Sequence, residues 1–178
     1  MRRFLLLLSY SLLLVGCNAE PSLQKYFVKK SEQQNFTVLD LSPEIFNLEG
    51  SKLNRDEKSA LKSFDKVNLL VFRADSTAGK SFDVESKALK SILKDKKYEL
   101  LMKVGSGKDG ASISYIGKDD EHIDEFVIYA AKKGNGIAVA RVLGKNMNPT
   151  GVMTILSLIR KSNIDTKQLE PLKNLMKG

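Results

Sequence analysis

Four segments in the C-terminal half of the chain decide the fold: YELLMKV (98–104), ASISYI (111–116), EFVIYAA (125–131) and IAVARVL (137–143). Each is rich in β-forming residues or alternates between apolar and polar positions, as strands do. The three connections are short and rich in Gly, Asn and Asp: 106–110, 117–122 and 132–136. Such connections favour hairpins. The pattern predicts a four-stranded antiparallel meander.

Further strands and helices are expected on either side of the meander. The additional strands are FTVLDL (36–41) and VNLLVFR (67–73). The expected helices are one over 56–64 capped by Asn54, one with an apolar stripe at Val84, Ala88, Leu89, Ile92 and Leu93, one with a stripe at Val152, Ile155, Leu156 and Ile159, and a final one over 166–176. A parallel sheet would need a crossover helix between successive strands, and the meander has none. We predict an α+β fold: an antiparallel sheet with a four-stranded C-terminal meander and helices packed on one face.

The N-terminus has the pattern of an export signal. Arg2 and Arg3 precede an apolar run over 4–15, which suits a signal peptide and is shorter than the roughly 20 residues of a membrane span. Leu14-Val15-Gly16-Cys17 resembles the lipobox of bacterial lipoproteins, in which the cysteine becomes the new N-terminus and carries acyl chains such as palmitate. We expect a cleaved lipoprotein signal peptide over 1–16, a lipidated tether over 17–24 and a single α+β domain over 25–178.

Composition and charge narrow the classes of function. Twelve Gly, four Pro and 42% apolar residues exclude collagen-like and low-complexity proteins. Cys17 is the only cysteine, so its lipidation excludes disulfides, CxxC redox chemistry and a cysteine nucleophile. Removing Arg2 and Arg3 lowers the formal charge from +8 to +6. In an envelope compartment without nucleic acid or nucleotide, this basic balance indicates anionic lipid headgroups, an acidic glycan or a protein partner.

The segment 74–81 ends in Gly79-Lys80-Ser81, as a phosphate-binding loop does, but Ala74 replaces the first glycine of that motif. No apolar strand ends in the aspartate that such a site uses to hold Mg²⁺. We interpret the segment as a polar loop with a helix cap and expect no nucleotide and no cofactor. Asp75-Ser76-Thr77 also fits an O-glycosylation pattern of exported Bacteroidetes proteins, which makes Ser76 a candidate acceptor.

Acidic residues surround the only histidine. The candidate metal ligands are Asp119, Asp120, His122 and Asp124, with Glu121 and Glu125 beside them. The EF-hand spacing is absent, and one histidine cannot build a three-histidine zinc site. A hydrolase would also depend on His122, and no nucleophile-elbow motif occurs. We expect a solvated hairpin turn, with no metal site and no catalytic residues, and keep a hydrolase or metal-binding domain using 119–125 as an alternative.

Arg141 lies in an otherwise apolar strand. On the face that it shares with Ile137 and Val139 it would be buried and need a carboxylate partner. If the sheet exposes that face, Arg141 is a surface residue, and we favour this second interpretation.

The meander and its end together resemble a family of Bacteroidetes lipoproteins known as domain of unknown function 4252. The residues that carry the resemblance are the strand over 98–104, the short strand over 112–115, Asp124-Glu125-Phe126-Val127, and the segment Val139 to Pro149 with its Gly144-Lys145-Asn146 turn. The resemblance covers 22–176 and implies a lipoprotein signal and a fold, but no catalytic residues. Some members look associated with envelope-stress or sigma-factor regulation.

We therefore expect a non-catalytic, lipid-anchored lipoprotein that acts as a binding module in the cell envelope. The resemblance implies that surface lipoproteins carry a charged patch just after the cysteine, and the nearly uncharged segment 18–22 therefore favours the periplasmic side. We favour the outer membrane over the inner one. The acyl chains would hold the membrane, and an envelope protein or glycan would be the partner. A regulatory partner in sigma/anti-sigma signalling is the alternative.

Overall fold

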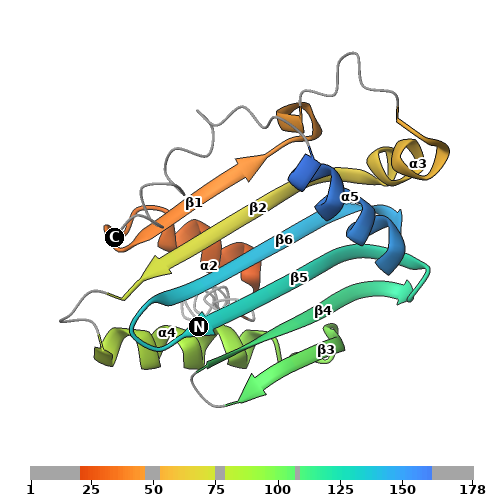
Figure 1. Ribbon diagram of the computed structural model, residues 1–178. Helices are drawn as coiled ribbons and strands as arrows, with labels where there is room; N and C mark the ends of the chain where they lie inside the picture. The colour runs from red at the N-terminus through yellow and green to blue at the C-terminus, as the bar shows by residue number, and fades with distance from the viewer. Residues whose placement is uncertain (1–20, 47–52, 75–78, 107–108, 162–178) are drawn as a thin grey trace, which may run out of the picture.

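The computed structural model describes residues 21–46, 53–74, 79–106 and 109–161. A six-stranded antiparallel sheet in the order β1-β2-β6-β5-β4-β3 forms its centre (Figure 1). The strands are β1 (Phe36–Leu41), β2 (Phe64–Arg73), β3 (Glu99–Ser106), β4 (Asp109–Asp119), β5 (His122–Lys132) and β6 (Gly136–Met147). The predicted α+β class and the C-terminal meander, β3 to β6, are confirmed. The connection expected over 117–122 is mostly strand, because β4 and β5 continue to a two-residue turn at Asp120 and Glu121.

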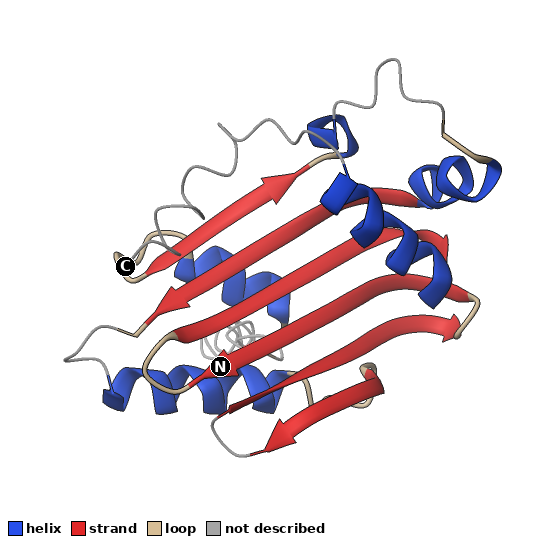
Figure 2. Cartoon of the chain, viewed as in Figure 1, coloured by secondary structure: helices blue, strands red, loops and turns tan. Residues whose placement is uncertain are grey.

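The helices lie on both faces of the sheet, as Figure 2 shows. Helices α2 (Leu23–Lys30) and α4 (Gly79–Ile92) cover one face, and α3 (Arg55–Ser63) and α5 (Pro149–Lys161) pack on the other. The expectation that the helices pack on one face is therefore wrong. Apolar residues occupy consecutive positions in β5, so Val127 packs in the core under α2 and α4 while Phe126 packs in the core under α5. A strand with this pattern needs cover on both faces.

Each face has its own apolar core. The core under α2 and α4 includes Leu23, Phe27, Phe72, Phe82, Leu89, Tyr129 and Val139. The core under α3 and α5 includes Ala60, Phe64, Ile123, Phe126, Val142, Met147 and Ile155. Gly136 allows the β5–β6 hairpin to approach β2, because a Cβ there would lie 2.0 Å from the backbone oxygen of Phe72.

Helix α2 begins inside the segment that we assigned to the tether. Ser22 caps it, with its hydroxyl accepting from the backbone N–H of Lys25 at 3.3 Å. Leu23 is fully buried, and with Tyr26, Phe27 and Lys30 it forms the buried stripe of the helix. The folded domain therefore starts two residues earlier than the sequence indicated.

Helix α3 begins as predicted, with a capping box. Asn54 accepts from the backbone N–H of Glu57 at 2.8 Å, and the Glu57 carboxylate accepts from the backbone N–H of Asn54 at 3.0 Å. In α4 the predicted stripe is partly wrong, because Val84 is 62% exposed and Phe82 packs in the core instead. The helix expected over 166–176 lies outside the described residues. Within the described part of the chain, no helix is long and apolar enough to cross a membrane.

Candidate functional site

Strand β3 forms an edge of the sheet, with β4 as its only neighbour among the described strands. All eight of its residues are exposed. Leu100 is 61% exposed, Met102 52% and Val104 56%. A register shift between Leu100 and Met102 interrupts the alternation of the strand, so Leu100 lies on the face of α4 opposite Ser114, and Met102 lies on the other face opposite Ile113. β3 therefore offers apolar side chains on both faces beside an unpaired backbone edge.

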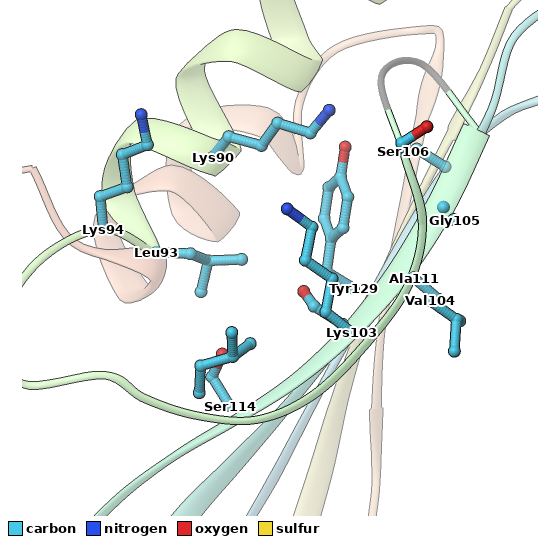
Figure 3. A pocket seen from close by; sticks show the side chains of 14 residues that line it. Lys90, Leu93, Lys94, Lys103, Val104, Gly105, Ser106, Ala111, Ser114 and Tyr129 are labelled. Carbon is cyan, nitrogen blue, oxygen red and sulfur yellow. The ribbon is translucent and has the colours of Figure 1, made fainter.

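A hollow of about 470 Å³ lies on the α4 side of this edge. We call it the basic groove. One wall is formed by Lys90 of α4 and by Leu93 and Lys94 of the turn that follows the helix, and the floor is formed by β3, β4 and β5 (Figure 3). The floor residues are mostly small: Gly105, Gly110, Ser112, Ser114 and Ala131. The hollow exists because these residues leave space where larger side chains fill the rest of this face.

Three ammonium groups border the basic groove. Lys90 comes from α4, Lys94 from the turn that follows it and Lys103 from β3. In Figure 3, Lys103 points into the space under α4, whereas Val104 points away from it. Among the described residues, no Asp, Glu, His or Cys lines the groove. The site is therefore positive and has no group suited to general acid–base or nucleophilic chemistry by a carboxylate, imidazole or thiol.

Tyr129 stands at the back of the basic groove. Its hydroxyl lies 3.0 Å from the hydroxyl of Ser86 in α4, and the Lys90 ammonium lies 5.9 Å from the centre of its ring. Burial raises the pKa of Tyr129, and the bond with Ser86 offsets part of that rise. Tyr129 therefore stays neutral near pH 7 and offers the groove an aromatic surface.

Arg141 is buried, so the surface interpretation that we favoured for it is wrong. Its Nε lies 2.7 Å from Oε1 of Glu125 and its Nη2 lies 2.9 Å from Oε2, a bidentate pair. Its Nη1 donates to Gln24 of α2 at 2.8 Å, and the guanidinium lies 5.7 Å from the centre of the Phe27 ring. Burial alone would lower the pKa of Arg141, but the hydrogen bonds and charge of Glu125 raise it. These contacts join α2 to β5 and β6, which is a structural role.

A second polar cluster joins α2 to α4. Glu85 accepts from the Tyr26 hydroxyl at 2.5 Å and from the Lys30 ammonium at 2.6 Å. Burial, followed by the hydrogen bond and charge of Glu85, raises the pKa of Tyr26 far above its ordinary value. All polar groups of this cluster have partners, so we assign it to packing of the helix layer.

The acidic turn does not assemble a metal site. Asp119 and His122 form one exposed pair, with Oδ1 and Nδ1 2.6 Å apart. The hydrogen bond from His122 lowers the pKa of Asp119. Glu125 leaves the cluster, because it points to the other side and binds Arg141. Among the described residues no three His, Cys, Asp or Glu side chains are placed to hold a metal ion.

Two of the predicted site residues fall outside the described residues. These are the lipidation site, Cys17, and the candidate glycosylation site, Ser76. Of the rest, the structure brings together only Asp119 and His122. The basic groove was not predicted from the sequence.

The model of a protein family described as Domain of unknown function (DUF4252) matches residues 26–155. The chain belongs to this family. No curated protein and no solved structure matches the chain. The matched region of this DUF4252 protein runs from α2 into α5 and contains all of β3, the basic groove and the pair of Arg141 and Glu125.

Nothing in the description of the DUF4252 family assigns a chemistry to these residues. The signals for the groove were nevertheless present in the sequence. Lys90 and Lys94 are four residues apart and so share a helix face. Ser112 and Ser114 occupy alternate positions of one expected strand, whereas the expected strands before and after it in the sequence carry large apolar residues. Strand order and helix placement were needed to bring them to one place.

Proposed function

We propose that this DUF4252 protein is a non-catalytic, lipid-anchored binding domain of the cell envelope, with β3 as the docking strand for a protein partner. The observation that carries the proposal is the exposure of β3. Edge strands are commonly protected by charges, proline, bulges or cover. β3 carries four large apolar residues and only two charges, Glu99 and Lys103, and no helix of the described part of the chain covers it.

The opposite edge of the sheet, strand β1, is largely covered. Phe36 of β1 is buried, and four of the other five residues of that strand are partly buried. Phe36 packs against the ring of Phe72 with 4.9 Å between centroids. Only one of the two edges therefore presents a fully exposed strand.

An extended segment of a partner could pair with β3 as an added strand. Backbone hydrogen bonds would provide affinity and alternate side chains specificity. Full burial of a side chain such as Leu100 or Met102 stabilises by about 1.5–3 kcal/mol. The Glu99 carboxylate accepts a 2.6 Å hydrogen bond from the hydroxyl of Tyr115, which packs on the face of α3 and α5. The Glu99 side chain is therefore held against the sheet and does not block the backbone edge of β3.

Site-specific photo-crosslinking in cells tests the docking strand. A photoreactive residue at Met102 should give the same crosslinked envelope protein repeatedly. The matched control is Met153, which is 61% exposed and belongs to α5, a helix that packs against α3. Identical products from both positions, or none from Met102 under several growth conditions, would contradict docking at β3.

The anchor rests on the lipobox and is tested separately. Cys17→Ala should abolish incorporation of radiolabelled palmitate and release the protein from the membrane fraction, because several acyl chains are needed for firm attachment. Unchanged labelling and fractionation would refute the anchor and leave the docking strand in place.

The non-catalytic part of the proposal is supported by the position of the only histidine. His122 is on the exposed turn and pairs with Asp119, and the lining of the basic groove contains no carboxylate or thiol. His122→Ala should therefore leave the cellular function of the protein intact. A loss of function in that variant with normal folding would revive the hydrolase alternative.

A further inference from the structure

We propose that the basic groove binds a single-chain anionic amphiphile, meaning one hydrocarbon chain that ends in a carboxylate or phosphate. This site shares β3 with the partner-docking edge, but ligand binding in the groove does not depend on the partner. The argument rests on the size of the groove, its charge and its apolar walls.

The size of the groove suits a small ligand. Its volume of about 470 Å³ lies within the range of roughly 300–1,000 Å³ typical of small-molecule sites. The hollow is built into the fold, because α4 stands over the sheet where β4 offers only Gly110, Ser112 and Ser114 on that face. Nothing larger than a hydroxymethyl group comes from β4 to fill it.

The charge of the groove favours an anion. Two lysines near the helix layer have carboxylate partners: Lys30 with Glu85 at 2.6 Å and Lys97 with Asp95 at 3.8 Å. Lys94 and Lys103 form no salt bridge with any described residue. They approach the groove from opposite walls (Figure 3). A hollow bordered by uncompensated charges of one sign concentrates ligands of the other sign.

The apolar side chains in the walls of the groove favour a ligand that also has an apolar portion. Leu93 lies in the turn after α4, Leu100 of β3 also lines the groove, and the ring of Tyr129 closes the back. Lysine side chains also place methylene stems along apolar surfaces while their ammonium groups reach water. A free inorganic anion would leave this surface exposed to water, whereas a hydrocarbon chain would cover it.

Photo-labelling of the full lipoprotein in phosphatidylcholine nanodiscs tests the proposal. The probes are a long-chain carboxylate and a lysophosphatidate, each with a diazirine in the chain, and the corresponding long-chain alcohol. Mass spectrometry should locate the label in peptides of α4 and of β3 and β4. Either anionic probe labelling these peptides supports the site, and the stronger label identifies the headgroup. Equal labelling of them by the neutral alcohol would overturn the requirement for an anion.

Two double variants distinguish the effect of the lysines that line the groove from the effect of nearby lysines that do not. Lys94→Gln with Lys103→Gln should lower labelling about thirtyfold, as the loss of two solvent-accessible ion pairs at the upper end of their usual strength implies. The control, Lys87→Gln with Lys96→Gln, removes the same charge from exposed positions outside the groove and should label as the unmodified protein does. Equal labelling of both double variants would overturn the proposal.

A third variant tests the space rather than the charge. Ser112→Leu places an apolar side chain in the groove while all lysines remain, and it should abolish labelling by both anionic probes. Circular dichroism that matches the unmodified protein would show that the sheet is intact. Undiminished labelling of a folded Ser112→Leu protein would show that the ligand lies elsewhere.

Discussion

Replacing Glu125 by glutamine should destabilise the domain far more than its small chemical change suggests. The side chains of Glu125 and Arg141 are only 9% and 7% exposed, and two hydrogen bonds of 2.7 and 2.9 Å join them. Glu125→Gln removes the negative charge and turns one of the two acceptors into a donor that faces the guanidinium. Arg141 would then remain buried and charged, with Gln24 and a single amide oxygen as acceptors.

The magnitude follows from that burial. Breaking a buried ion pair by removing one partner costs about 3–5 kcal/mol. We expect the lower end, about 3 kcal/mol, because the Gln24 oxygen still accepts one hydrogen bond from Arg141. A domain of this size has about 5–15 kcal/mol of total stability, so the variant would lose a large part of it.

Urea unfolding followed by circular dichroism measures the effect, and a double-mutant cycle isolates the pair. Glu125→Leu with Arg141→Met removes both charges and should remain within about 1 kcal/mol of the unmodified protein. Glu121→Gln, on the exposed turn, should change stability by less than about 0.5 kcal/mol. The reasoning would be refuted if Glu125→Gln behaved like Glu121→Gln, or if the double variant lost as much as the single variants combined.

Three further predictions concern stability. Asn54→Ala should cost about 1 kcal/mol in urea unfolding, because it removes the capping box of α3; no change would mean that the cap is unimportant. Leu89→Ala should lower the free energy of unfolding by about 2–5 kcal/mol, because Leu89 is fully buried, whereas Val84→Ala in the same helix should lower it by less than about 0.5 kcal/mol. Similar losses in the two variants would show that α4 does not pack with Leu89 inward and Val84 outward. Burial raises the pKa of Tyr98 to about 12 and that of Tyr26 further, so the stability that these phenols contribute is complete below pH of about 10 and falls as the pH rises from there through the folded pKa. Phenolate absorbance should therefore rise together with unfolding at alkaline pH, and ionisation near pH 10 in the folded protein would contradict this.

The strands and caps could be predicted from the sequence because their signals are local. Asn54, followed three residues later by Glu57, announces a capping box, and the structure contains it. The hairpins of the meander follow from their short connections. The alternation that identified β3 as a strand gave no information on its neighbours, and the exposure of β3 depends on β2 pairing with β6 at the other end of the meander.

The error on Arg141 has a similar origin. Its partner could be found only from the strand register. Val127 lies opposite Arg141, so Glu125 is the diagonal neighbour on the same face. Reading the sequence alone, we grouped Glu125 with the acidic turn, because it directly follows Asp124. A register shift between Ile123 and Glu125 sends these neighbouring carboxylates to different environments.

The basic groove could not be predicted from the sequence, because it forms where small side chains leave space unfilled. Small residues such as Ser112 carry little signal in a hydropathy pattern. Whether they form a hollow depends on which helix lies above them, and α4 reaches that position through contacts far away in the sequence, such as Tyr26 with Glu85.

The bond between Arg141 and Gln24 also decides how the domain would respond to a pull. If Cys17 is held in a membrane, tension enters the domain at the start of α2, which begins only a few residues later. Through Gln24 that tension reaches Arg141, and through Glu125 it is shared by the adjacent strands β5 and β6. The load would thus pass to interior strands of the sheet and spare the edge strand β1, which could be peeled away singly. Resistance to mechanical force and resistance to urea would then depend on the same guanidinium.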